Sequence, residues 1–289
     1  NDDGSDNQNT FIGTQAGYTN TAGRWNTASG YQAFYSNTIA NGNDASGYQA
    51  LYSNTTGYFN TASGFQALYS NINGNWNVAS GVRALYSNLD GSYNTASGLQ
   101  ALHSNLDGSY NTASGYRALY FNTTGGQNTA IGSFALYSNK GGSSATAIGY
   151  KAMHYANDTT AAFDNINVAV GYEALRGSGN PSANTGNFNT ALGYQTLWSN
   201  TTGNNNTASG SWALVSNTTG YGNTASGFRA LNSNTTGNFN TSLGYFAGYG
   251  TGNANFNQCT FVGANSYANV DRTNVTMLGY GIGNAQCTG

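Results

Sequence analysis

The sequence predicts an all-β chain that folds as a parallel β-solenoid of about 16 coils with a 17-residue period. Three observations lead to this prediction. The phrase NTASG recurs verbatim six times, glycine returns at the same place in every repeat, and charged residues make up only 6% of the 289 residues. A 17-residue repeat is too short for a pair of helices, but it suits one coil made of two short strands and two turns.

The repeat register follows when the Asn of NTASG is taken as the first position of each coil. Neighbouring coils from Asn9 to Asn240 start 17 residues apart, except that two intervals of 22 lead to Asn167 and Asn189. The chain then divides into a leader or linker (1–8), the solenoid (9–258) and degenerate terminal coils or a cap (259–289). Coils are expected to begin at Asn9, Asn26, Asn43, Asn60, Asn77, Asn94, Asn111, Asn128, Ala145, Asn167, Asn189, Asn206, Asn223, Asn240, Cys259 and near Asn274.

The first half of a coil is predicted to be a short strand that ends at a glycine. In the coil that begins at Asn60, residues 60–63 form an extended run and Gly64 makes the turn. We expect the second and fourth positions, which are Thr and Ser in the middle coils, to face the inside. Such a core would be thin, because Ser adds little apolar burial.

The second half of a coil is predicted to be a more apolar strand, residues 65–69 in the same coil, followed by turn residues. Alternation would send the sixth, eighth and tenth positions to one face and the ninth, usually Leu, to the other. Both faces would then be apolar, and one of them would need a cover. An exposed apolar stripe of that length is unusual for a monomer, so we infer lateral self-association.

Asparagine occupies two columns of the predicted stack, at the first and twelfth positions. Coils stacked about 4.8 Å apart turn each column into a ladder of like side chains, which disfavours charge and favours amides that hydrogen-bond along the stack. The structural ladder is expected at Asn54, Asn71, Asn88, Asn105 and Asn122.

Composition argues against several classes of function. The net charge of −2 and the eight scattered basic residues make nucleic acid an improbable partner, and no apolar run is long enough for membrane insertion. His103 and His154 replace the usual Tyr of the tenth position without acidic or Cys partners, so we interpret them as structural. No nucleophile, base and orienting residue can be assembled, so an enzyme is not expected.

The chain does not begin with Met, and we take it as a processed or excised segment.

Several repeats resemble a known family. The phrases NTAIGSFALYSN (128–139), ATAIGYKAM (145–153), NVAVGYEAL (167–175) and NTALGYQTL (189–197) are similar to the head repeat of trimeric autotransporter adhesins, and GYQALYSNTTGYFNTA (47–62) resembles repeats of tail-fibre-like proteins. The resemblance implies a left-handed β-roll, a homotrimer and a non-enzymatic fibre at a bacterial or phage surface that adheres to host or matrix glycans or proteins. The family repeat is near 14 residues and carries Ile where the middle coils here carry Ser.

Two features are candidate recognition surfaces. One is an aromatic column at the last position of the coil, which could stack on sugar rings or pack between rolls: Trp25, Phe59, Trp76, Tyr93 and Tyr110. The other is the pair of longer repeats, whose five extra residues each are expected to form surface loops around Asn157, Asp158 and Thr159 and around Asn180 and Pro181.

Three further features are local. Cys259 and Cys287 could form a disulfide that closes the last coils, or they could be unpaired thiols. Asp2, Asp3 and Asp6 have a weak likeness to a calcium loop without its closing Glu, and no other cofactor is expected. Asn54, Asn122, Asn200, Asn217 and Asn234 match the glycosylation sequon, which we interpret as turn sequence.

The sequence thus predicts an extracellular structural or adhesive fibre module that assembles with itself. Three rivals stay open: a head-to-tail filament subunit, a carbohydrate-binding fibre tip and an ice-binding solenoid. Ice binding would need paired Thr columns on a bare surface, whereas the single Thr column is expected to face inward.

Overall fold

The computed structural model describes residues 7–250, 255–268 and 270–283. It confirms the predicted fold class, because sixteen three-residue strands pair in parallel with no α-helix in the described part of the chain. The chain divides into two compact units, Asn1–Ser143 with Thr159–Phe163 and Ser144–Asp158 with Asp164–Gly289. Each unit contributes eight coils, and the trimeric state expected from the resemblance stays a prediction.

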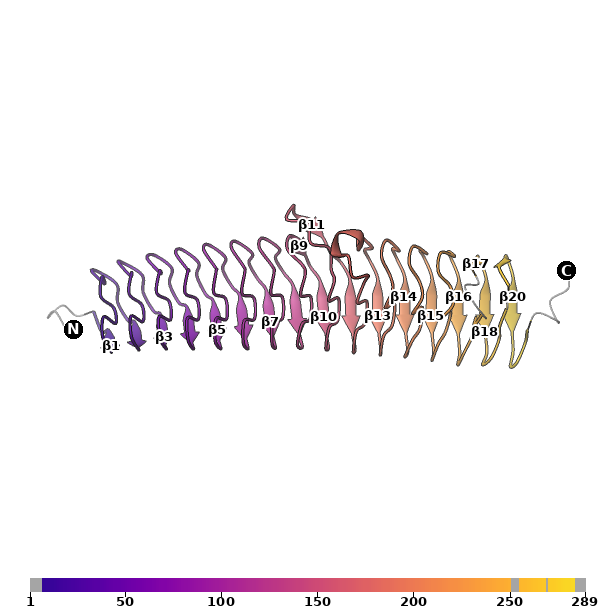
Figure 1. Cartoon of the computed structure of the whole chain (residues 1–289), viewed down its shortest axis with the longest axis horizontal. Coiled ribbons are helices and arrows are strands. Elements are labelled where there is room, and N and C mark those ends of the chain that lie inside the picture. Colours follow the sequence, from indigo (N-terminus) through magenta and orange to yellow (C-terminus); the bar gives the residue numbers. More distant parts are fainter. Residues whose placement is uncertain (1–6, 251–254, 269, 284–289) are drawn as a thin grey trace. The chain divides into compact units, whose positions relative to one another are not determined.

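The first unit stacks eight strands in sequence order (Figure 1). The register is constant, so that like positions face each other; Ala62 pairs with Ala79 and Ser63 with Ser80, for example. These strands are β1 (Thr10–Ile12), β2 (Thr27–Ser29), β3 (Asp44–Ser46), β4 (Thr61–Ser63), β5 (Val78–Ser80), β6 (Thr95–Ser97), β7 (Thr112–Ser114) and β8 (Thr129–Ile131).

The second unit repeats the arrangement, with shorter satellite elements beside the main row. In this unit β17 (Phe256–Asn257) pairs with β19 (Arg272–Thr273), and one 3-10 turn, η1, covers Pro181–Ala183. Another short pair, β9 (Gly142–Ser143) with β11 (Phe163–Asp164), lies in the first unit except for Asp164. The main strands are β10 (Thr146–Ile148), β12 (Val168–Val170), β13 (Thr190–Leu192), β14 (Thr207–Ser209), β15 (Thr224–Ser226), β16 (Thr241–Leu243), β18 (Thr260–Val262) and β20 (Thr276–Leu278).

The strands face the opposite way from the prediction. In β4, Ala62 is buried, whereas Thr61 and Ser63 on either side of it are exposed. The same pattern holds through β2–β6, so the third position fills the interior and the Thr and Ser columns form the outer surface. The expectation that Thr and Ser face inward was wrong. A coil this narrow has room beside its turns for the methyl group of Ala, and the two hydroxyl side chains remain in water.

The predicted second strand at residues 65–69 was also wrong, because this stretch is a turn. Gln66 (φ 55°) and Leu68 (φ 52°) both adopt the left-handed conformation. Two such residues on either side of Ala67 bend the chain so sharply that the eighth and ninth positions both point inward, and Ala67 and Leu68 are fully buried. Leu at the ninth position is therefore the main apolar side chain inside most coils. Because this half of the coil is a turn, it does not have the second apolar strand face that was predicted.

The buried asparagines join the coils. Asn71 donates from its side chain to Asn54 Oδ1 of the preceding coil (2.7 Å) and to the carbonyl of Gly74 (2.9 Å). Asn60 works differently: its Nδ2 donates to the same Gly74 carbonyl, and its Oδ1 accepts the backbone N–H of Asn77. The sequon asparagines lie in the first of these ladders, where burial and hydrogen bonds leave their amide nitrogens inaccessible to a glycan.

Candidate functional site

The outer strand face carries hydroxyl side chains in a regular order over most of the first unit. The second position is Thr in β1, β2, β4, β6, β7 and β8 and is exposed in all of them except β8; the fourth position is Ser in β2–β7 and is exposed in all of them except β7. Hydroxyl groups therefore repeat along the stack at the coil spacing of about 4.8 Å. In this unit Asp44 of β3 is the charged exception and Val78 of β5 the apolar one among the described second positions. A surface of this kind can match a periodic lattice.

The aromatic column of the last position is exposed and stacked on itself. The side chains of its five predicted members are 44–59% exposed. All five lie in the first unit. Ring centroids lie 4.3 Å apart for Phe59 and Trp76 and 4.9 Å apart for Tyr93 and Tyr110, with nearly parallel planes. From Phe59 to Tyr110 each ring stacks on the next, which occupies most of the faces that would stack on a sugar, whereas Trp25 is separated from this run by a coil whose last position is glycine.

A second aromatic ladder runs along the tenth position of the first unit. Its rings stack at centroid distances of about 5 Å, and His103 is inserted between Tyr86 (5.1 Å) and Tyr120 (4.9 Å). The seventh position lies beside this ladder. There the guanidinium carbons of Arg83 and Arg117 lie 5.6 and 5.3 Å from the ring centroids of Tyr86 and Tyr120.

Electrostatics sets the protonation of His103. Its burial lowers the pKa of the imidazole below the ordinary value of 6.5, and the positive charges of Arg83 and Arg117 lower it further. The ring is therefore neutral at pH 7. No role was predicted for these two arginines from the sequence. They could have been noticed because both replace Gln, the usual residue of the seventh position in this unit.

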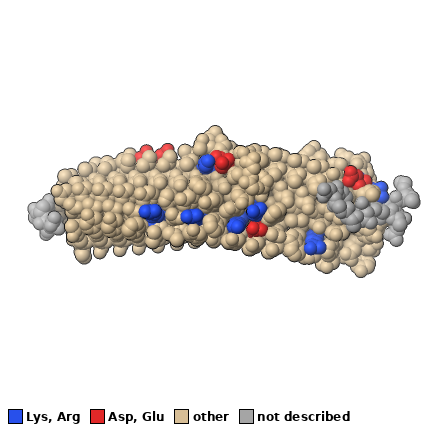
Figure 2. All heavy atoms as spheres, in the orientation of Figure 1, with Lys and Arg blue, Asp and Glu red and all other residues tan. Residues whose placement is uncertain are grey.

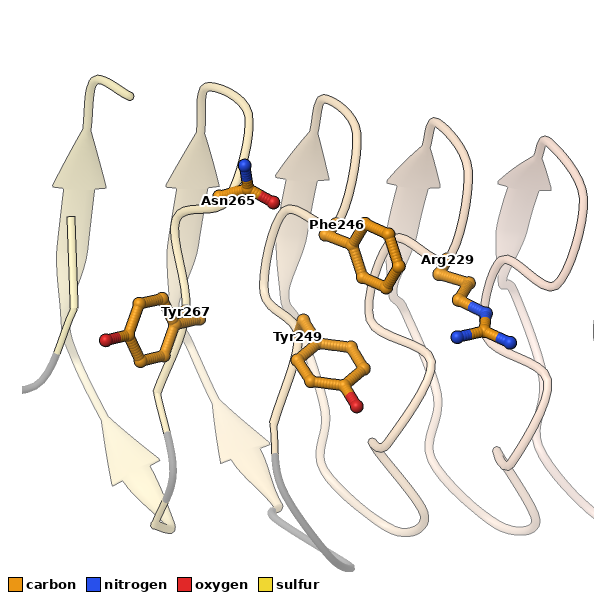
Figure 3. A pocket seen from close by; sticks show the side chains of 5 residues that line it. All are labelled: Arg229, Phe246, Tyr249, Asn265 and Tyr267. Carbon is orange, nitrogen blue, oxygen red and sulfur yellow. The ribbon is translucent and has the colours of Figure 1, made fainter. Parts of the chain in front are cut away.

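The second unit carries a recess of about 320 Å³ beside its last strands. Figure 3 shows Arg229, Phe246 and Asn265 following one another along three coils, with Tyr249 and Tyr267 on the other side. The guanidinium of Arg229 lies 4.9, 5.5 and 5.6 Å from the rings of Trp212, Phe228 and Phe246. The recess can accept a small ring that carries hydrogen-bond acceptors.

The longer repeats form surface segments that are held in different ways. In the second, Asn180 is exposed, Pro181 begins η1, and Asn184 clamps the loop. The Asn184 amide donates to the carbonyls of Tyr155 and Ser178, and its Oδ1 accepts from the backbone of Ser178. In the first, the Thr159 carbonyl accepts the backbone N–H of Gly141, and Asn157 and Asp158 are partly buried.

The remaining predicted sites lie mostly outside the described residues. Cys259 is buried beside the carbonyl of Asn257, whereas Cys287 is not described, so their disulfide stays a prediction. Asp2, Asp3 and Asp6 are likewise not described. Within the described ranges no cluster of three His, Cys, Asp or Glu side chains could hold a metal ion. The same ranges hold no helix with the length and apolar character to cross a bilayer.

No family model, no curated protein and no solved structure matches the chain.

Proposed function

We propose that this chain is a non-enzymatic structural and adhesive module of an extracellular fibre, and that its coils associate laterally with other copies of the chain. The observation that carries the proposal is an apolar column at the sixth position of the first unit. Its side chains are 37–46% exposed in six successive coils: Tyr31, Tyr48, Phe65, Val82, Leu99 and Tyr116.

A second copy is the partner that fits this column best. The column repeats once per coil, at about 4.8 Å, and a surface with another period would lose register after a few coils. No charged residue occupies the fourth or sixth position of these coils, so two copies meet without repulsion. Full burial of a side chain of this size stabilises by about 1.5–3 kcal/mol, and because only 37–46% of each side chain is still exposed, an interface gains roughly half of that or less at each of the six positions. Three copies are the number that the family resemblance implies.

Sedimentation of a paired variant tests the proposal. Phe65→Lys with Leu99→Lys places two charges in the column, and we expect the trimer to dissociate. Ile72→Lys is the matched control, because Ile72 is exposed to a similar degree (38%) but lies at the thirteenth position. An assembly that survives the paired variant, or that Ile72→Lys disrupts equally, would refute the column as the interface.

The outward strand face favours ice binding as a second candidate. One reason to disfavour it, the inward orientation of Thr, was wrong, whereas the other reason, a single Thr column where ice binding would need a pair, still holds. Two parallel columns of hydroxyl groups, from Thr at the second position and Ser at the fourth, lie on the outer strand face. We expect the wild-type chain to inhibit ice recrystallisation if it has this function. The double variant Thr95→Lys with Thr112→Lys should abolish the inhibition, whereas Thr124→Lys, at an exposed turn, should retain it. Ice growth unaffected by the wild-type chain would exclude it.

A further inference from the structure

One cluster in the first unit has positive charge and aromatic side chains but no acidic partner. It consists of Arg83, Gln100, His103 and Arg117, which we call the arginine cluster. Gln100 lies between the two arginines at the seventh position, and His103 lies between Tyr86 and Tyr120 at the tenth. The cluster therefore extends over three coils on one side of the stack.

Hydrogen-bond donors dominate the arginine cluster. Arg83 Nε donates to Gln66 Oε1 (3.0 Å) and Arg117 Nε donates to Gln100 Oε1 (2.8 Å), which uses the carbonyl of Gln100. Each guanidinium has four further N–H groups on its terminal nitrogens. No acceptor for these groups, or for the amide nitrogen of Gln100, is found among the described residues. The cluster thus offers N–H donors without a protein acceptor.

No carboxylate balances the two arginines on this side of the stack. The described acidic residues of the first unit are Asp44 at the second position and Asp90 and Asp107 at the fourteenth, and none is at the seventh or tenth. Figure 2 shows the basic side chains of this part of the molecule in the middle of the face and the acidic ones along its edge. An external anion would supply the missing acceptors.

The spacing and the rings indicate which anion fits. The arginines are two coils apart, about 9–10 Å, which is close to the length of a disaccharide, so a chain with one acidic group per disaccharide can reach both. Guanidinium groups bind carboxylate and sulfate through paired N–H donors. Nucleic acid fits less well, because single strands need free ring faces on which bases stack, and the rings here cover one another.

We propose that the arginine cluster binds an acidic polysaccharide, with Arg83 and Arg117 each pairing with a carboxylate or sulfate group and Gln100 donating a hydrogen bond between them. The inference rests on the adhesive part of the proposed function and gives it a ligand class and a site.

Binding of a hyaluronan octasaccharide to the full chain, measured by calorimetry at low salt, tests the inference. We expect Arg83→Gln with Arg117→Gln to weaken binding at least tenfold. Arg24→Gln removes the same charge from an exposed residue at the sixteenth position, and we expect no change. A neutral octasaccharide of glucose should not bind, and binding should weaken as salt is raised.

Four outcomes would overturn the inference: no binding of hyaluronan by the wild-type chain, equal binding by the double variant, equal binding of the neutral octasaccharide, or tighter binding of single-stranded DNA than of hyaluronan. The solution mass of the wild-type chain separates this inference from the proposed function. If the wild-type chain assembles but does not bind the hyaluronan octasaccharide, the proposed binding by the arginine cluster is refuted and lateral assembly is not. Binding by a chain that remains monomeric refutes lateral assembly and leaves the cluster standing.

Discussion

At the scale of the residue, the fifth-position glycine sets how closely two coils approach. Gly81 has φ +132°, and a Cβ added to it would lie 2.6 Å from the carbonyl oxygen of Gly98 in the next coil. The neighbouring atoms are backbone and cannot move aside without separating the coils. Glycine at this position is thus required both by its own conformation and by the stacking distance.

Substitution of this glycine should be costly. We expect Gly81→Ala to destabilise the chain by more than about 2 kcal/mol, because backbone strain and a steric clash act together. Gly179→Ala is the control, since nothing lies within 4 Å of the added Cβ. Thermal unfolding followed by circular dichroism compares the two, and a Gly81→Ala melting temperature equal to that of the control would contradict the stacking account.

We expect His103 to make the stability of the chain, and the proposed binding of an acidic polysaccharide, depend on pH. Its pKa is below 6.5 in the folded chain, so on acidification the unfolded state takes up a proton first, and stability falls as the pH drops below 6.5 towards the folded pKa. A bound polyanion would raise the pKa, so affinity for the acidic octasaccharide should rise over the same range. The charged and titratable groups that face the imidazole are Arg83, Arg117, Tyr86 and Tyr120.

The variant His103→Tyr restores the usual residue of the column and serves as the comparison. We expect it to remove the change in affinity between pH 7 and pH 5.5 while leaving the fold intact. If the wild-type chain and this variant show the same pH dependence of binding, another group is responsible.

Some roles of single residues could be predicted from the sequence and others could not. Asn71 and its equivalents were assigned to a hydrogen-bonded ladder because a repeated amide is one of the few polar groups that can pair with copies of itself, whereas the burial of this ladder was not predicted. The left-handed conformation of Leu68 could not be predicted, because a bulky residue rarely adopts it and the sequence carries no Gly or Asn at that position as a sign.

At the scale of the element, each coil is one short strand joined by sharply bent turns. The repeat period determined that coils stack in parallel, but the period alone does not fix which face of a three-residue strand points inward. Thr-Ala-Ser alternates equally well either way, and the size of Ala62 decides in favour of burial because the coil is narrow. The same narrowness makes residues 65–69 a turn, since a second strand would leave the coil too wide for Leu68 to fill.

Two neighbouring substitutions test the orientation of the strand. Ala96 is fully buried and Thr95 is exposed in β6. We expect Ala96→Lys to cost several kcal/mol and to prevent folding of the coils around it, because it buries an unpaired charge. Thr95→Lys should change the free energy of unfolding by less than about 0.5 kcal/mol. Chemical denaturation measures both, and the reverse order of effects would restore the inward orientation of Thr.

At the scale of the whole molecule, the repeat presents a few outer columns many times over. The arginine cluster lies in the first unit, whereas the exposed hydroxyl face and the exposed apolar side chains of the sixth position occur in both units, and each takes its form from the period that builds the fold. The sequence predicted self-association from the apolar content of the repeat. It placed the apolar stripe on a strand that does not exist, whereas the structure places exposed apolar side chains at the sixth position, just after the fifth-position glycine.

Sedimentation of the wild-type chain at several concentrations tests lateral assembly most directly. We predict one species near three times the 30.0 kDa chain mass, unchanged over a wide range of concentration. Polymers that grow with concentration would favour the head-to-tail filament instead. A monomer at every concentration would contradict the account, because the sixth-position column would then remain in water on a molecule that has no partner for it.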